Sequence, residues 1–291
     1  MRTEHTLSDL SSLGLLKITG ENAKKFLQGQ LTCNLDEVTA SQSRLGAHCN
    51  PQGRIISLFR IFLYQDSYYL QMPKENWVLA HAALKKYAVF FKVDLTDASE
   101  TLPRIGYCGS ELKNIIPSLP ENDNDMVITD HFSIIKIQGV SPRYEILGNV
   151  TLSKEKLTSQ TNNIWQYLDI TSGIPNIYPE TSEKFLPHEI NLPTLNAVSF
   201  NKGCFTGQEI IARMQYRGKL KTHLYQAKAE SNTAPIRGGA IYSGKDACGS
   251  IVDYCQVSYN SYELLIIASE KDIETTLALD PENAQQLEIK R

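Results

Sequence analysis

Several local motifs are absent from this sequence. Its six cysteines include no C-x-x-C pair, and its six histidines show no zinc-ligand spacing. Structural zinc sites and iron–sulfur clusters are usually held by several Cys or His side chains at short, regular spacing. The sequence therefore encodes no self-contained metal site, and we expect no metal ion to be bound by this chain alone.

Long apolar runs and a surplus of basic residues are also missing. No stretch reaches the roughly 18–20 apolar residues that a membrane-spanning helix needs. The first 14 residues lack the apolar segment of a secretory signal. We therefore expect a cytoplasmic protein with no membrane partner. The formal net charge of −3 argues against nucleic acid coating the whole surface.

One local segment runs against this overall charge. Residues 213–221 contain Arg213, Arg217, Lys219 and Lys221 and no acidic residue. Two interpretations are open: a solvated basic face, or a surface that binds tRNA directly. Strong salt dependence of tRNA binding would favour the second.

The chain has 291 residues, enough for two or three domains of about 100–150 residues. Apolar periodicity and turn residues predict the same order of elements twice. In the first half they are a strand at 15–20, a helix at 21–31, a hairpin at 55–64 and 68–72, a helix at 75–89 and a strand at 93–97. In the second half they are a strand at 104–109, a helix at 110–119, a hairpin at 131–139 and 143–148, a helix at 152–160 and a strand at 164–170.

This order is that of a split βαβ, ferredoxin-like domain. After residue 219, short β-rich runs separated by Gly, Asn, Ser and Lys turns predict a small antiparallel barrel, followed by a polar, loosely held tail at 280–291. The predicted class is α+β. The predicted domains are 1–100, 101–200 and 220–285, with a loop and helix at 201–219 between the second half and the barrel.

That loop reads NKGCFTGQE and contains the cysteine whose neighbours favour chemistry. Apolar residues after Gln208 have helical spacing, so Thr206 or Gly207 is the expected N-cap, with Glu209 in the first turn. Cys204 thus lies just before a helix N-terminus and two residues from Lys202. Both features favour the thiolate over the thiol.

Two further residue types shape the expectation for this loop. Gly203 and Gly207 would allow positive φ or close approach to a ligand, and Arg213 lies one to two turns along the helix. The alternative for a lone G-C-x-x-G is a glycine turn around a buried cysteine. The full octet KGCFTGQE is more specific than that.

The octet, followed by IIAR and YRGK, resembles the signature of the YgfZ-type folate-binding proteins, which are relatives of the glycine-cleavage T-protein. The segments FLQGQLT, AHCNPQGRIISLFRIF, KKYAVFFKV, SGIPNIYPETSEKFLPHEINL and AVSFNKGC resemble the family in the same order. The resemblance covers most of the chain.

The resemblance implies two ferredoxin-like domains and a small β-barrel in a GcvT-like ring with a folate channel near its centre. It implies tetrahydrofolate or a derivative as cofactor, and an accessory role in assembly or repair of iron–sulfur enzymes such as a tRNA methylthiotransferase. We expect a monomer in which Cys204 is the essential thiol. The signature residues are Lys202, Gly203, Gly207, Gln208, Glu209 and Arg213.

For folate binding, Trp165 and Gln30 are the expected residues. Trp165 could stack on a flat pterin or benzoyl ring, or it could be an ordinary core tryptophan. Relatives commonly carry Glu-Ala-Gly where this chain has Thr171, Ser172 and Gly173, which could alter the mode of folate binding.

The competing function is folate-dependent aminomethyl transfer. T-proteins carry an acidic residue after the turn equivalent to NPQGRII, where this chain has Ser57 and Leu58. Neither side chain can accept a proton near neutral pH. The sequence therefore favours the accessory function over the transferase.

Overall fold

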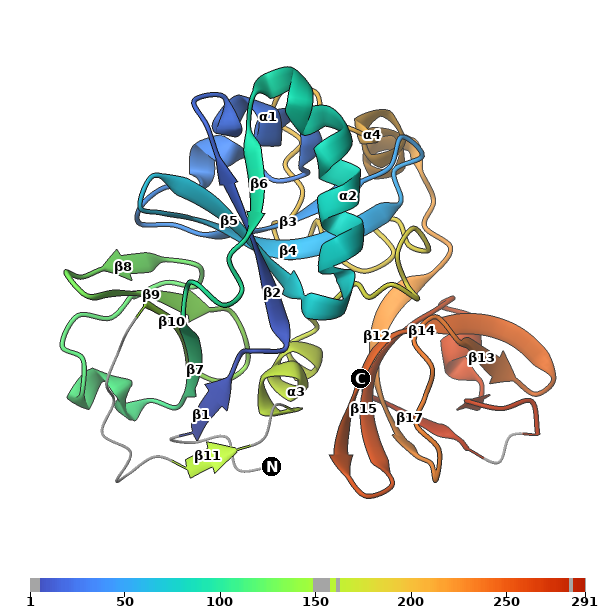
Figure 1. Cartoon of the computed structure of the whole chain (residues 1–291). Helices are drawn as coiled ribbons and strands as arrows, with labels where there is room; N and C mark the ends of the chain where they lie inside the picture. Colours follow the sequence, from blue (N-terminus) through green and yellow to red (C-terminus); the bar gives the residue numbers. More distant parts are fainter. Residues whose placement is uncertain (1–5, 149–157, 161–162, 283–284, 291) are drawn as a thin grey trace.

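The computed structural model of this protein describes residues 6–148, 158–160, 163–282 and 285–290. Within these ranges lie three β-sheets, one of five strands and two of six, with α-helices packed against them (Figure 1). The protein is of mixed α+β class, as the sequence predicts. None of the helices in these four ranges is long and apolar enough to cross a membrane.

The five-stranded sheet has the order β3-β4-β5-β2-β6. Its elements, with the two helices between them, are β2 (Leu13–Thr19), α1 (Ala23–Gln30), β3 (Arg44–Cys49), β4 (Ile55–Tyr64), β5 (Ser67–Pro73), α2 (Trp77–Ala88) and β6 (Asp94–Asp97). All its neighbouring strands are antiparallel. The order is that of a split βαβ unit with β3, which was not predicted, added at one edge.

Both helices pack against this sheet through side chains at helical spacing. Phe26 and Leu27 of α1 and Ala80 and Leu84 of α2 are buried, and they share one apolar cluster with residues of β2, β4 and β5. Burial of a side chain such as Phe26 contributes about 1.5–3 kcal/mol. This cluster fixes the C-terminal end of α1, against which the cysteine loop packs.

The second sheet has the order β11-β1-β7-β10-β9-β8. Its strands are β1 (Thr6–Asp9), β7 (Arg104–Cys108), β8 (Met126–Ile128), β9 (Phe132–Ile137), β10 (Arg143–Gly148) and β11 (Thr158–Gln160). The predicted strand at 104–109 and the predicted hairpin are present. The N-terminal strand β1 was not predicted, and it pairs with β7 across the sequence distance between the two halves.

Three predictions in the second half are wrong. Residues 164–170 form not a strand but helix α3 (Asn163–Thr171), because Ile164, Trp165 and Leu168 form a buried helical face. A short apolar run of this kind fits either element. The predicted helix at 110–119 shrinks to a 3₁₀ turn at Glu111–Asn114, since Pro117 stops its continuation. Of the predicted helix at 152–160, the last three residues form β11 and the rest lies outside the described residues.

The third sheet has the order β16-β13-β14-β15-β12-β17 and is nearly closed into a barrel. Its strands are β12 (His223–Glu230), β13 (Ala240–Ser243), β14 (Asp246–Ser258), β15 (Ser261–Ala268), β16 (Leu277–Ala278) and β17 (Leu287–Lys290). An isolated bridge between Ala278 and Gln286 brings the two edges together. The expectation of a loosely held tail is wrong for β17, which pairs with β12.

A central apolar core connects the first sheet, helix α3 and the barrel. It includes Leu45 and Leu58 of the first sheet, Ile170 of α3 and Leu265 of the barrel. The irregular segment 173–200 crosses this region and contributes seven buried apolar side chains to the same core. The cysteine loop lies on this core through Phe205. The candidate site therefore has two parts, the loop and a cavity, that share one core.

Candidate functional site

The cysteine loop leads into helix α4 (Gln208–Arg217), and Gly207 is its N-cap with φ of 83°. A Cβ at Gly207 would lie 2.6 Å from the carbonyl oxygen of Asn50 and 3.0 Å from Cα of Gly53. Gly53 in turn has φ of 75° and packs against Ile210. Gly53 of the NPQGR turn therefore contacts Gly207 at the start of α4. Only glycine suits position 207, because φ is positive there and a Cβ would clash with the Asn50 carbonyl oxygen.

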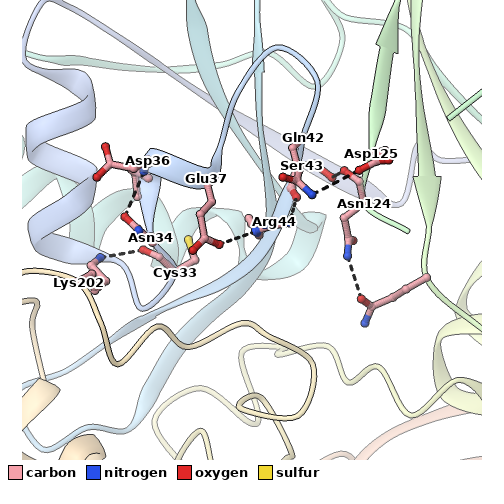
Figure 2. A network of polar contacts seen from close by, with 12 residues as sticks. Cys33, Asn34, Asp36, Glu37, Gln42, Ser43, Arg44, Asn124, Asp125 and Lys202 are labelled. Carbon is pink, nitrogen blue, oxygen red and sulfur yellow. Dashed lines mark hydrogen bonds and ion pairs between the residues drawn. The ribbon is translucent and has the colours of Figure 1, made fainter. Parts of the chain in front are cut away.

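Lys202 attaches the loop to the residues that follow α1. Its Nζ donates to the carbonyl oxygens of Leu31, at 2.6 Å, and Cys33, at 2.8 Å. The contact with Cys33 is visible in Figure 2. Nζ also lies 5.1 Å from the centre of the Phe205 ring, and burial lowers the pKa of Lys202 to about 8. The sequence predicts that the Lys202 ammonium favours the thiolate of Cys204. In the structure, this ammonium instead donates hydrogen bonds to two backbone carbonyl oxygens.

Gln30 lies at this loop as well. The backbone N–H of Thr206 donates to the carbonyl oxygen of Gly29 at 3.2 Å, and Thr206 Oγ1 donates to Gln30 Oε1 at 3.4 Å. Gln30 is buried, and it is not among the residues that line the cavity around Trp165. The two residues expected to bind folate are thus in different parts of the site.

Cys204 is the exposed cysteine of the six. Burial raises the pKa of Cys33 and Cys108 to about 11 and that of Cys255 to about 12. It also raises the pKa of Cys49, which is buried, and of Cys248, which is half-buried. The thiolate is therefore disfavoured at the other five positions.

The remaining signature residues surround the thiol without enclosing it. Glu209 and Arg213 are exposed on α4, and Gln208 is half-buried. A Cβ at Gly203 would meet no atom within 4 Å, so nothing in this structure requires glycine there. Among the described residues, no group of three or more His, Cys, Asp or Glu side chains is placed to hold a metal ion.

The second part of the site is a cavity around Trp165, where the first and second sheets, α3 and Arg237 of the segment between β12 and β13 meet. It has two adjoining sides that share Trp165 as a wall, one of about 50 Å³ and one of about 110 Å³. Both sides are lined by Leu13, Trp165, Asp169 and Asn176. Drug-sized ligands occupy roughly 300–1,000 Å³, so a fused-ring ligand enters only if side chains of this wall shift.

Trp165 is at once a core residue and a wall of this cavity. It is 6% exposed, and its ring lies so close to Gly106 that a Cβ there would be 2.6 Å from it. The Arg143 guanidinium lies 5.2 Å from the ring centre and pairs with Asp169 at 2.8 Å. Both interpretations of Trp165 are therefore compatible with its position.

Sequence reasoning missed the charged residues of the cavity. Glu145 of β10 is fully buried and accepts from Gln71 Nε2 at 2.8 Å, while its second oxygen, Oε1, has no hydrogen-bond partner among the described residues. Burial raises its pKa. Arg60 also lines the cavity and donates to Asn124 Oδ1 at 2.7 Å. The one signal in the sequence was a carboxylate at an interior position of the β-rich run RYEILG.

The wider side of the cavity ends at Arg237 of the barrel. Its guanidinium lies 3.5 Å from the centre of the Tyr178 ring and pairs with the buried Asp253 at 2.9 Å. Burial raises the pKa of Asp253 to about 6 despite this partner. Gln166 of α3 donates to the same carboxylate at 3.1 Å, which joins the barrel to α3.

Ser57 and Leu58, where the sequence carries no acid, bring no charge to the cavity. Leu58 lines the cavity, and Ser57 is fully buried, with no hydrogen-bond partner for Oγ in the part of the chain that the structure describes. Thr171 donates through Oγ1 to the carbonyl oxygen of Tyr167 at 2.8 Å, so it caps a turn of its own helix. Thr171 does not line the cavity.

Known proteins resemble this chain over most of its length. A family model described as the GCVT N-terminal domain matches residues 1–146. The tRNA-modifying protein YgfZ of Colwellia psychrerythraea is 35% identical over 76% of this chain and 71% of its own length. A YgfZ of Vibrio vulnificus is 30% identical, and the match covers 97% of this chain and 90% of the relative. This chain belongs to the YgfZ family.

The fold is also that of a T-protein. The glycine cleavage system aminomethyltransferase T from Bartonella henselae matches 98% of this chain and 85% of its own, with a TM-score of 0.74 and 15% identity. At that identity the likeness shows the fold alone. This chain thus combines an aminomethyltransferase-like fold with a loop that presents Cys204.

Proposed function

We propose that this protein binds a reduced folate, tetrahydrofolate or a derivative, in the cavity around Trp165. The observation that carries the proposal is that Trp165 and the buried Glu145, with an unpartnered oxygen, line the same cavity. A pterin is flat and presents adjacent N–H donors on one edge. An aromatic wall and a carboxylate acceptor match these two features.

Calorimetric titration with tetrahydrofolate or its 5-formyl derivative tests folate binding. Saturable binding is expected, and the absence of binding at millimolar ligand would contradict the proposal. Replacement of Glu145 by Gln exchanges a carboxylate, which accepts hydrogen bonds through both oxygens, for an amide of nearly the same volume. It should weaken folate binding by about 1.5–3 kcal/mol. Replacement of Trp165 by Ala should cost about 1–3 kcal/mol if the ring stacks on the ligand.

The role of this folate-binding protein is accessory to iron–sulfur enzymes. It supports their assembly or repair, and the tRNA-modifying name of its relatives suggests a tRNA methylthiotransferase among them. Cys204 is the essential thiol, since it alone of the six is exposed. One cysteine supplies one ligand, so any cluster handled there takes further ligands from a partner.

One observation favours the competing function, aminomethyl transfer to tetrahydrofolate. Glu145 offers a carboxylate with a raised pKa in the cavity, and general bases are often tuned in this way. Against it, an apolar residue, Leu58, lines the cavity at the position after the NPQGR turn where the resemblance leads us to expect an acid in a transferase. We expect no formation of methylenetetrahydrofolate from a lipoyl-carrier intermediate beyond that seen with the protein omitted. A rate that depends on this protein would establish the transferase instead.

A further inference from the structure

The end of α4 and the segment after it form a cationic surface. Arg213, Arg217, Lys219 and Lys221 are all exposed, and none has an ion-pair partner among the residues that the structure describes. Arg213 and Arg217 are one turn apart and share a helix face. We call these four residues the α4 cationic strip. Unpaired cations in this density are unexpected on a chain of net charge −3.

An exposed aromatic ring lies within this strip. Tyr216 is 69% exposed, and its ring packs edge-on against Phe200, with centroids 6.1 Å apart. Phe200 in turn packs near His188, whose Nε2 hydrogen-bonds Gln215 Oε1 at 3.1 Å. The Tyr216 ring is therefore held at one edge while most of it faces solvent, which suits stacking by a planar group.

Phe200 also lines a polar groove of about 740 Å³ beside the strip. Six side-chain amides line this groove: Asn34, Asn124, Gln138, Asn196, Asn201 and Gln215. Its two acids are neutralised, Glu37 by Arg44 at 2.9 Å and Asp123 by Lys136 at 3.6 Å. Figure 2 shows the Glu37–Arg44 pair beside Asn34 and Asn124. An amide can both donate and accept hydrogen bonds, as base edges and ribose hydroxyls require. Four of the six already hydrogen-bond within the protein: Asn34 with Gln28, Asn124 with Arg60 and Gln138, and Gln215 with His188. Asn196 and Asn201 have no side-chain hydrogen bond among the described residues.

We propose that the α4 cationic strip, Tyr216 and this groove together bind single-stranded RNA. The strip neutralises phosphates, Tyr216 stacks on a base, and the amides contact base edges and 2′-hydroxyls. An acidic protein surface would use the cations but neither the exposed ring nor the amides. Asn201 is three residues before Cys204, so bound RNA would lie near the exposed thiol. The proposal does not depend on folate binding.

The test is fluorescence anisotropy of a labelled 12-nucleotide single-stranded RNA of mixed sequence, titrated with the full chain between 50 and 200 mM salt. Each neutralised phosphate contributes a slope of about −0.7 to log affinity against log salt, so four cations give about −3. Replacing Arg217 and Lys219 together by Gln should halve that slope. The matched control replaces Lys85 and Lys86, an exposed pair on α2, and should leave it unchanged.

The aromatic contribution is tested separately. Tyr216→Ala should weaken binding about tenfold with the salt slope intact, whereas Tyr216→Phe should bind as the native protein does. DNA of the same sequence should bind more weakly, since it lacks the 2′-hydroxyl.

Four outcomes overturn the proposal: no saturable binding at 50 mM salt, an unchanged slope in the Arg217 and Lys219 variant, equal binding of DNA, or displacement by poly-glutamate as effectively as by unlabelled RNA. The last result would assign the strip to an acidic protein partner. Thermal melting of each variant verifies its fold. Folate titration of the same samples shows separately whether the proposed function holds.

Discussion

The two parts of the candidate site are built in opposite ways. The cysteine loop presents an exposed thiol on a backbone held by glycines and carbonyl oxygens, with Lys202 and Gly207 as its attachments. The cavity around Trp165 is buried and is made by side chains from distant strands, among them Glu145 and Arg60. The loop is a local feature of the sequence, whereas the cavity exists only after the three sheets pack.

We therefore expect substitutions in the loop and substitutions in the cavity to act by different physical effects. Changes at the loop should act through backbone conformation and thiol exposure. Changes in the cavity should act through burial of charge and the fit of a ligand. The following experiments test that separation, in decreasing order of expected effect.

The largest contrast is in thiol reactivity. Cys204 is exposed, whereas a buried thiol such as Cys49 reacts only when the surrounding structure opens. We expect alkylation of Cys204 at pH 7.5 to be more than about a thousandfold faster than that of Cys49. Peptide-by-peptide mass spectrometry with iodoacetamide measures this. Equal rates would show that exposure of the loop does not set reactivity.

A Cβ at Gly207 should be the most damaging small change in the loop. Ala there must adopt φ of 83° and meets the Asn50 carbonyl oxygen at 2.6 Å. We expect Gly207→Ala to lower the free energy of unfolding by about 2–4 kcal/mol. Gly203→Ala is the matched control, because its Cβ meets nothing within 4 Å. Urea denaturation gives both values, and equal losses would contradict the packing described at Gly207.

The two parts should also respond oppositely to pH. Burial lowers the pKa of His48, which forms a β-bridge with Leu31 beside the loop, to about 4. Burial raises the pKa of Asp253, which pairs with the cavity residue Arg237, to about 6. The unfolded chain therefore binds more protons at His48, so its contribution to stability is lost as pH falls from about 6.5 to 4. The contribution of Asp253 has the opposite sign and is lost as pH rises from about 4 to 6.

Replacement of His48 by Leu tests the His48 part of this pH dependence. The stability difference between variant and native protein should shift in favour of the variant by about 3 kcal/mol between pH 6.5 and pH 4. Denaturation midpoints of both proteins across that range provide the measurement. A difference that is constant with pH would mean that folding does not lower the pKa of His48.

Loss of the Lys202 attachment should have the smallest effect on stability. Lys202→Met removes two hydrogen bonds to backbone carbonyls but also relieves burial of a charge, so we expect a loss of about 1–2 kcal/mol. Lys202→Arg keeps a cationic donor and serves as the comparison. Urea denaturation reports the loss. If Met and Arg behave alike, the carbonyl contacts do not hold the loop.

The same contrast explains what the sequence could predict. The loop could be predicted because Gly207, the start of α4 and Cys204 are neighbours in the chain. Most of the first sheet could be predicted because its helices and strands have clear apolar periodicity. Strand β1 and helix α3 were missed because their assignment depends on pairing and packing across about 100 residues or more. Glu145 was missed for the same reason: only the folded protein shows that its carboxylate faces the cavity of Trp165.

The most direct test of the central claim is complementation of a strain that lacks this protein, scored by methylthiolated tRNA. Native protein, Cys204→Ser and the matched control Cys248→Ser, which changes the half-buried barrel cysteine, are compared at equal expression. The account predicts that native protein and Cys248→Ser restore the modification and that Cys204→Ser does not. Full restoration by Cys204→Ser would contradict the claim that the Cys204 thiol is essential, and the loop would then have a structural role alone.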